Sequence, residues 1–390
     1  MTKIYNFDNI KSSQFALENN IILEWEDCVH TEYKSYQFLK EYIKKDSLPL
    51  SYIAYPWALL IDYYHKFKSK FNKFSDFINQ LNLLEQFRNK NEYSFTVVQS
   101  YHFKKYLSDF KSFGIKYIFS PHITKNEFLE IYYKYDLIIY PYYIYPSVTS
   151  NLKKKLEKEY LYCFIGNIKY NLDKPSNIRN KLINLNHPKN TYVKKLDEWH
   201  FNESVYNNQL NIINSNKSKT DIELNKENRE NEYKKYMEKS LYSICPLGIG
   251  PNSIRLWESF SYNSIPVSIS DDLWLPFYMN TDFKDLILSI KEDDISKVTK
   301  LKNIKIDDKY YNFYKNNLSD KTFGSILPIF FNRKRKINLL VPWFNIDENS
   351  ERFHEIHQCL KKNIENIYIN KIYFFYEIEN KDNIKFDKNI

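Results

Sequence analysis

The segment that decides the expected fold reads Leu241-Tyr-Ser-Ile-Cys-Pro-Leu-Gly-Ile-Gly-Pro-Asn-Ser-Ile-Arg-Leu-Trp-Glu-Ser-Phe260. It begins with a short apolar run at residues 241–245, which is typical of a buried strand. Residues 246–251 hold prolines and glycines and therefore predict a loop. Residues 253–262 carry the apolar spacing of a helix, and a second apolar run follows at 265–269. Strand, loop, helix and strand make a βαβ unit, which predicts an α/β fold with a parallel sheet.

Scarce residue types gather in this loop. The whole chain has five glycines and seven arginines, yet Gly248, Gly250 and Arg255 lie close together. Glycine is favoured where the backbone must approach a ligand closely, and arginine where a planar donor meets phosphate or carboxylate. Asn252 or Ser253 would cap the helix, whose N-terminal N–H groups attract an anion. The segment therefore predicts an anion-binding loop.

Glu258 follows Arg255 on the same predicted helix, about one turn further along. A carboxylate at this place can accept two hydroxyl hydrogen bonds, as from a ribose. The alternative for the whole segment is a tight turn between core elements, and a Gly-x-Gly pair taken alone favours that alternative. The dinucleotide fingerprint Gly-x-Gly-x-x-Gly is absent from the sequence.

The same segment resembles the signature block of exostosin-type glycosyltransferases. The likeness rests on the order and spacing of residues across 246–277, and weaker likeness is found at 52–58, 164–182 and 198–201. The residues of the signature block are Pro246-x-Gly248-x-Gly250-Pro-x-Ser253-x-Arg255-x-Trp257-Glu258, Ile265-Pro266-Val267-x-x-Ser270-Asp271 and Leu275-Pro276-Phe277.

The resemblance implies a glycosyltransferase B fold, in which two Rossmann-like domains face a cleft. It implies a hexosyl- or pentosyltransferase of polysaccharide biosynthesis that uses a nucleotide-sugar, with a UDP-sugar as first candidate, and a saccharide acceptor. It also implies inversion at the anomeric carbon and no essential metal or cofactor. For Arg179, a structural salt bridge is the alternative to donor binding. The residues expected to bind the donor are Gly166, Arg179, Gly248, Gly250, Asn252, Ser253, Arg255, Glu258 and Asp271.

The first half of the chain alternates between strand and helix patterns. Helical patterns such as residues 67–87 and 104–113 separate most of the predicted strands, which favours a second parallel sheet covered by helices. In such sheets ligands bind at the carboxyl ends of the strands. The predicted strands are residues 52–54, 95–98, 117–119 and 137–140.

Three titratable residues in this half, His122, His102 and Asp62, are candidates for a catalytic base. An inverting transfer needs a base that takes the proton of the acceptor hydroxyl as it attacks. His102 and His122 both follow predicted strands, so we expect them to face the cleft, with His122 as first choice. A histidine with a purely structural hydrogen bond is the alternative for each.

Three regions are expected along the chain, namely an acceptor-side domain at 1–155, a donor domain at 156–332 and an extension at 337–390. The extension has a strand, a helix and a strand pattern, is too small for a core of its own, and resembles the start of a further glycosyltransferase domain. Residues 202–235 are rich in Asn, Lys and Glu and predict an exposed loop or a frayed helix.

The charge of the chain does not point to nucleic acid. The net charge is +9, but Lys supplies most of the 57 basic residues, and these are spread along the chain. A nucleic-acid surface needs basic residues clustered on one face. The cluster Arg333-Lys-Arg-Lys336 is most simply a solvated linker. We therefore expect no nucleic-acid partner.

We expect a cytoplasmic protein without metal chemistry. The four cysteines lack metal or redox spacing, which fits free thiols in a reducing compartment. The sequence shows no signal peptide and no membrane-spanning apolar run, and peripheral membrane association stays open. It also lacks an Asp-x-Asp motif, the usual handle for metal and diphosphate. Because animal and plant exostosins are typically anchored in the secretory pathway, these features favour a bacterial or viral member of the family.

A rival function is a non-catalytic nucleotide- or glycan-binding protein on a degenerate glycosyltransferase fold. Such a protein would be expected to lack motif residues, whereas Arg255 and Glu258 are both present. Release of free nucleotide from a nucleotide-sugar separates the two functions.

Overall fold

The computed structural model describes residues 3–7, 11–25, 30–46, 48–83, 94–150, 157–168, 177–196, 219–277, 281–332, 337–342, 349–364 and 369–375. The chain forms two compact units, Met1–Ile326 and Leu327–Ile390. Each contains parallel strands and helices, so the α/β class predicted from the sequence is confirmed.

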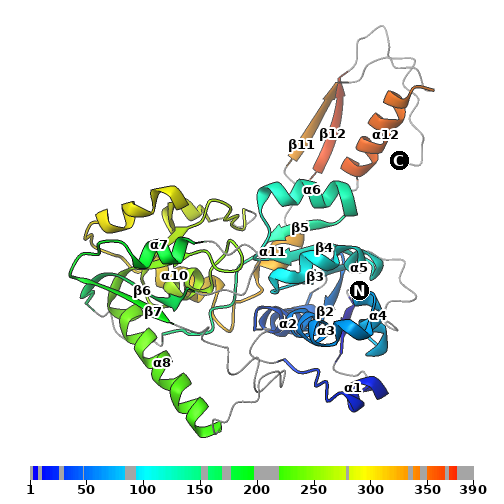
Figure 1. Ribbon diagram of the computed structural model, residues 1–390. Helices are drawn as coiled ribbons and strands as arrows, with labels where there is room; N and C mark the ends of the chain where they lie inside the picture. The colour runs from blue at the N-terminus through cyan, green and yellow to red at the C-terminus, as the bar shows by residue number, and fades with distance from the viewer. Residues whose placement is uncertain are drawn as a thin grey trace. The chain divides into compact units, whose positions relative to one another are not determined.

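The first half of the larger unit is built around a parallel sheet with strand order β1-β2-β3-β4-β5, which Figure 1 shows together with its helices. The strands β2 to β5 are those predicted from the sequence, and β1 is added at the edge. Residues of β2 and β3 are buried throughout, which explains why these strands carry no charged residue. The strands are β1 (Ile4–Asn6), β2 (Ser51–Ala54), β3 (Ser94–Val97), β4 (Ile115–Ser120) and β5 (Ile138–Pro141), and the helices are α1 (Gln14–Glu18), α2 (His30–Ile43), α3 (Trp57–Phe67), α4 (Phe74–Gln80), α5 (Leu107–Ser112) and α6 (Lys125–Tyr135).

The helix predicted at 67–87 is divided in the structure. α3 ends at Phe67, a 3-10 turn covers Lys68–Lys70, and α4 starts at Phe74. The division is stabilised where α4 begins, because the Asp76 carboxylate accepts a hydrogen bond of 3.2 Å from the backbone N–H of Lys73. Residues 84–87 lie outside the described residues. The helix predicted at 104–113 is likewise divided, into a 3-10 helix at Tyr101–Tyr106 and α5.

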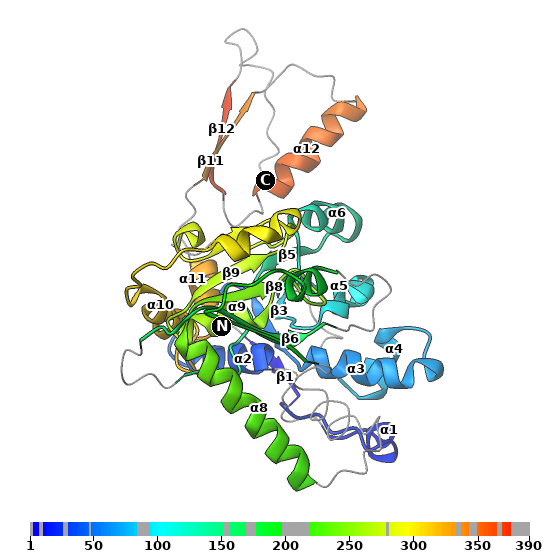
Figure 2. The same ribbon diagram turned by 60° about the vertical axis from the view of Figure 1, so that its left-hand side comes forward.

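The second half of the larger unit contains a second parallel sheet, with strand order β10-β9-β8-β6-β7. The predicted βαβ unit is confirmed as β8, α9 and β9, and α9 is followed by Asn263, whose φ of 47° stops the helix. Figure 2 shows β6, β8 and β9 side by side. The elements are β6 (Tyr160–Asn167), α7 (Ile178–Ile183), β7 (Thr191–Leu196), α8 (Lys219–Lys239), β8 (Ser240–Pro246), α9 (Ile254–Ser261), β9 (Ile265–Ile269), β10 (Leu288–Ile290) and α10 (Lys309–Asn317), with α11 (Ile326–Asn332) following.

Two parallel sheets with helices are consistent with a glycosyltransferase-B-like fold. The arrangement as two domains facing a cleft stays a prediction, as do the boundaries 1–155, 156–332 and 337–390. Of the Asn-, Lys- and Glu-rich stretch at 202–235, the described part belongs to the helix α8. The segment 198–201 and the basic cluster 333–336 lie outside the described residues.

The smaller unit contains the strand–helix–strand pattern predicted for the end of the chain. Its elements are β11 (Ile337–Pro342), α12 (Glu351–Ile364) and β12 (Ile369–Phe375). The two strands pair in parallel, with Leu340 opposite Tyr373.

Candidate functional site

The loop between β8 and α9 is held against the neighbouring strand. The backbone N–H of Leu247 donates to the carbonyl of Ile269 at 3.1 Å, and that of Gly248 donates to the carbonyl of Gly250 at 3.1 Å. These bonds fix the loop at the carboxyl ends of β8 and β9, where parallel sheets bind their ligands. We call residues 247–253 the donor loop.

Asn252 and Ser253 occupy the end of the donor loop, as predicted, and both are buried. Asn252 accepts a hydrogen bond of 2.9 Å from the indole of Trp257 and donates one of 3.4 Å to the carbonyl of Tyr142. It therefore links the donor loop to the first half of the unit. Ser253 is the N-cap of α9, but its hydroxyl accepts no hydrogen bond from that helix.

Gly250 brings the donor loop into contact with His122. A Cβ built on Gly250 would lie 2.3 Å from Nδ1 of His122, so any larger residue would force the imidazole to shift. His122 directly follows β4, in a loop where its backbone N–H donates to the hydroxyl of Ser120 at 3.3 Å. The contact therefore joins the carboxyl end of the first sheet to that of the second, as the placement of both residues after strands predicts.

The imidazole of His122 is uncharged near neutral pH and has a vacant nitrogen. Its Nδ1 is buried and makes no hydrogen bond within the described part of the chain. Burial lowers the pKa of His122 to about 3, and the positive charge of Lys104 acts in the same direction. A neutral imidazole with a vacant nitrogen can accept a proton.

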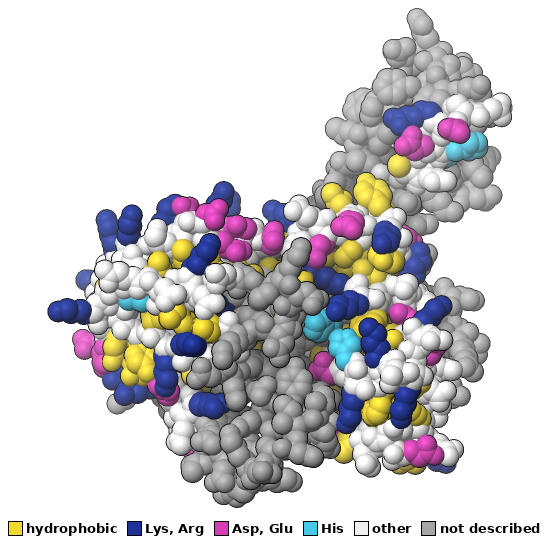
Figure 3. Space-filling model, in the orientation of Figure 1, with side chains coloured by type: hydrophobic (Ala, Val, Ile, Leu, Met, Phe, Trp, Pro, Cys, Tyr) yellow, Lys and Arg dark blue, Asp and Glu magenta, His cyan; other side chains and the backbone are white. Residues whose placement is uncertain are grey.

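His102 belongs to the same cluster of rings. Tyr101 stands between the two histidines, with ring centroids 5.9 Å from His102 and 6.0 Å from His122, and His65 lies 5.3 Å from His102. Nδ1 of His102 is also buried without a partner among the described residues, and burial lowers its pKa. Figure 3 shows histidine side chains beside Lys and Arg side chains on one face of this unit.

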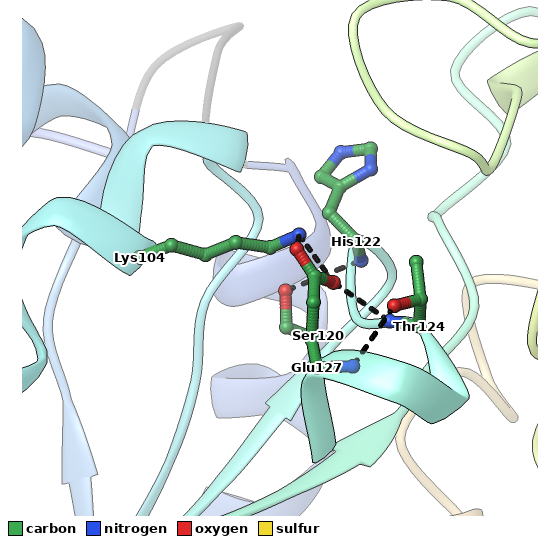
Figure 4. Close-up of polar contacts among 5 residues, drawn as sticks. All are labelled: Lys104, Ser120, His122, Thr124 and Glu127. Carbon is green, nitrogen blue, oxygen red and sulfur yellow. Dashed lines mark hydrogen bonds and ion pairs between the residues drawn. The ribbon is translucent and has the colours of Figure 1, made fainter. Parts of the chain in front are cut away.

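An ion pair supports the loop that carries His122 (Figure 4). Lys104 lies 2.6 Å from the carboxylate of Glu127, and Glu127 also accepts a hydrogen bond of 3.0 Å from the backbone N–H of Thr124. The ring of His122 points away from this pair. Burial lowers the pKa of Lys104, while the carboxylates of Glu127 and Asp272 act against that shift. The pair therefore fixes the loop and places a positive charge near His122.

Arg255 is buried beneath the donor loop. Its guanidinium donates to the carbonyl of Ile165 in β6 and, at 3.3 Å, to that of Ile244 in β8, and it lies 4.7 Å from the ring centre of Phe164. A Cβ on Gly166 would come within 3.2 Å of the guanidinium, so the glycine makes room for it. The Nε atom is buried and makes no hydrogen bond within the described ranges. Arg255 thus joins β6 to β8, the strand that leads into the loop, and its Nε has no partner among the described residues.

The structure places Glu258 where its carboxylate binds protein groups. The side chain is 4% exposed and accepts hydrogen bonds from the hydroxyl of Tyr233 at 2.6 Å, the backbone N–H of Val148 at 3.0 Å and the hydroxyl of Ser147 at 3.2 Å. Burial raises its pKa. This arrangement ties α9 to the connection after β5, and the ribose contact expected for Glu258 stays a prediction.

The two remaining donor-side candidates lie at the edges of the loop. Arg179, at the start of α7, donates to the carbonyls of Leu247 at 3.0 Å and Asn167 at 2.9 Å and so supports the loop backbone. Asp271 is exposed after β9, and its carboxylate accepts a hydrogen bond of 3.2 Å from the backbone N–H of Glu292.

Asp62 lies on α3, apart from the donor loop. Burial raises its pKa to about 7. Its charge adds to the effect of burial in raising the pKa of Glu32, which accepts hydrogen bonds at the start of α3. It does the same for Tyr106, whose hydroxyl lies 2.6 Å from Nε2 of His65. The structure therefore brings His102, His122 and Gly250 together, whereas Asp62 neighbours the far end of the ring cluster.

Sequence reasoning did not select four residues that belong to this site, namely Tyr101, Lys104, Glu127 and Ser270. Ser270 directly follows β9, and its hydroxyl is buried without a partner in the part of the chain that the structure describes. It lies in the quoted signature block, which was the available signal. Lys104 and Glu127 gave no signal, because their pairing spans 23 residues.

The contact between Gly250 and His122 predicts a coupled effect on stability. Gly250→Ala should lower the free energy of unfolding by about 1–3 kcal/mol, because the new methyl group overlaps the imidazole. In a His122→Ala background the same change should cost much less, because the space is open. Urea unfolding of the four variants measures this coupling. An equal loss in both backgrounds would contradict the contact.

The described residues contain no helix long and apolar enough to cross a membrane, and no three His, Cys, Asp or Glu side chains grouped to hold a metal ion. Cys163, Cys245 and Cys359 are free thiols, and Cys28 lies outside the described residues.

Comparison with known proteins places this site in a family context. Residues 122–305 match the exostosin GT47 domain, a range that begins at His122 and includes the donor loop, Arg255, Glu258 and Asp271.

Curated relatives match over a shorter stretch. A probable glucuronosyltransferase of Oryza sativa subsp. japonica is 40% identical over 73 residues, covering 19% of this chain and 17% of the relative. A probable glucuronoxylan glucuronosyltransferase of Arabidopsis thaliana is 36% identical over 66 residues, covering 17% of this chain and 15% of the relative. The chain thus spans less than a fifth of these relatives. Both are plant proteins, so they give no support to a bacterial or viral source. The matches support an exostosin-like glycosyltransferase.

Proposed function

We propose that the chain is an inverting glycosyltransferase that moves a hexosyl or pentosyl group from a nucleotide-sugar, with a UDP-sugar first, to a saccharide acceptor. The observation that carries this proposal is the contact between His122 and Gly250. It places a vacant imidazole nitrogen beside the loop expected to hold the diphosphate. The names of the relatives make UDP-glucuronic acid the first donor to test.

In the proposed reaction, His122 takes the proton of the acceptor hydroxyl while the hydroxyl oxygen attacks C1 of the donor sugar. The new C1–O bond forms on the face opposite the leaving diphosphate, and the bond between C1 and the phosphate oxygen breaks with its electrons going to the diphosphate. Configuration at C1 is thereby inverted. His102 is the second candidate for the base.

The low pKa of His122 fits a base that the donor activates. Before the donor binds, burial would keep the imidazole neutral, and a pKa of about 3 makes it a weak base. A diphosphate bound at the donor loop would bring negative charge close to the ring and raise its pKa. His122 would then gain basicity once the donor is in place.

The leaving diphosphate would be stabilised by protein groups. Backbone N–H groups at the start of α9 carry partial positive charge, and the buried guanidinium of Arg255 adds a full one behind the loop. We propose that these groups stabilise the leaving diphosphate without the help of a metal ion. A cytoplasmic location remains part of the proposal.

A screen of nucleotide-sugars for release of free nucleotide tests the proposal. We expect release that depends on an added saccharide acceptor and persists in excess EDTA. Loss of turnover in EDTA with recovery on Mg²⁺ or Mn²⁺ would contradict the metal-free mechanism. Tight nucleotide-sugar binding without any release would favour the alternative, a non-catalytic binding protein.

A further inference from the structure

Two aromatic rings stack in the loop that follows β9. The ring centroids of Trp274 and Phe277 are 5.4 Å apart, and their planes meet at 14°. Phe277 is 54% exposed, whereas Trp274 is partly buried. We call this pair the aromatic ledge.

The aromatic ledge rests on elements of the first sheet. Trp274 meets Phe128 of α6 edge-on, with centroids 5.4 Å apart at 73°, and packs against the apolar core of the first half. Phe277 lies 6.3 Å from Tyr140 of β5, which is buried. Both rings are therefore held by contacts from another part of the chain, and Phe277 is still partly exposed to solvent.

Two exposed carboxylates, those of Asp271 and Asp272, precede the aromatic ledge in the chain. Asp272 is near enough to act on Lys104, whose partner Glu127 is the neighbour of Phe128 in α6. The ledge thus combines an apolar face with carboxylates that can accept hydrogen bonds from hydroxyl groups.

This combination matches one ligand class. A pyranose has a face of C–H groups, which the negative face of an aromatic ring attracts, and a rim of hydroxyl donors. A nucleobase also stacks on aromatic rings, but the exposed carboxylates of Asp271 and Asp272 suit the hydroxyl rim of a sugar. The carboxylates therefore favour an uncharged saccharide.

We propose that Trp274 and Phe277 form a saccharide-binding subsite that holds one pyranose ring of the acceptor, beside the helix α6 that supplies Glu127 to the ion pair under the His122 loop. This inference rests on the proposed function for the identity of its ligand as the acceptor. Binding of a saccharide to the ledge can nevertheless be measured without any reaction.

The test compares binding of cellohexaose and xylohexaose to the full chain by calorimetry and ligand-detected NMR, without donor. Phe277→Ala should weaken binding about tenfold, the size expected from loss of one aromatic contact. Phe277→Tyr keeps the ring and should bind as the wild type does. Tyr133→Ala is the matched control, because Tyr133 is 80% exposed on α6 outside the ledge.

Unchanged binding in Phe277→Ala, an equal loss in Tyr133→Ala, or no binding of either saccharide by the wild type would overturn the subsite. Saccharide binding that depends on the ring of Phe277, in a protein that releases nucleotide from none of the donors, would support the subsite and reject the proposed catalysis. An acceptor KM that is the same in Phe277→Ala as in the wild type would reject the subsite and leave the proposed function standing.

Discussion

His122→Asn is expected to lower kcat by about 10²–10⁴, the range for loss of a general base. Asparagine is close in size to the imidazole, and the vacant Nδ1 makes no hydrogen bond among the described residues, so the fold should persist. Nucleotide-sugar affinity should change little, because the donor loop keeps its backbone bonds. Single-turnover kinetics with equilibrium donor binding measures both quantities.

His102→Asn provides the comparison for this experiment. A large loss of kcat in His102→Asn with wild-type turnover in His122→Asn would transfer the role of base to His102. The pH profile gives a second readout, because a pKa of about 3 leaves His122 neutral in the free enzyme above pH 5. The pKa of the acidic limb should therefore be lower in the pH profile of kcat/KM, which reports the free enzyme, than in that of kcat. The reason is that bound diphosphate raises the pKa of His122. Coincident limbs would contradict activation by the donor.

Arg255→Lys is expected to reduce both stability and turnover. The guanidinium bonds carbonyls on β6 and β8 at once, whereas an ammonium is a point donor and would leave one buried carbonyl unpaired. That loss should cost about 1–3 kcal/mol of unfolding free energy. Turnover should fall by about 10²–10³, as for one contact to developing transition-state charge.

Arg352→Lys is the matched control, because Arg352 is exposed and pairs with Glu355, three residues further along α12. Chemical unfolding and steady-state kinetics below the melting range separate the two effects of Arg255→Lys. Lower stability with full turnover would make Arg255 purely structural. Wild-type stability and wild-type turnover together would contradict any role for the buried guanidinium.

Much of the fold follows from local pattern. β8, α9 and β9 were predictable because apolar runs, breakers and a helical repeat succeed one another within a single βαβ unit. β7 gave no such signal, because it lies at the edge of its sheet and contains Lys194 and Lys195. The prediction of a single helix at 67–87 was wrong because the apolar spacing continues across the break before α4. The Asp76 carboxylate caps the start of that new helix.

The site was predictable in its position and less so in its contacts. Placing His122 and Gly250 after strands needed only the rule for parallel sheets. The burial of Glu258 depends on Val148, 110 residues away, and that of Arg255 on Ile165, 90 residues away. Spacing along the chain carries no information on such pairs, so residue types suggested ligand contacts where the structure shows bonds to protein.

The proton NMR spectrum of an oligosaccharide acceptor, recorded during incubation with the chain and an α-linked UDP-sugar such as UDP-glucuronic acid, tests sugar transfer most directly. We predict a new anomeric signal of β configuration that grows as free nucleotide is released and that is lost in His122→Asn. A new signal of α configuration would contradict inversion. No new signal from the folded chain across a full panel of donors and acceptors would contradict the glycosyltransferase proposal itself.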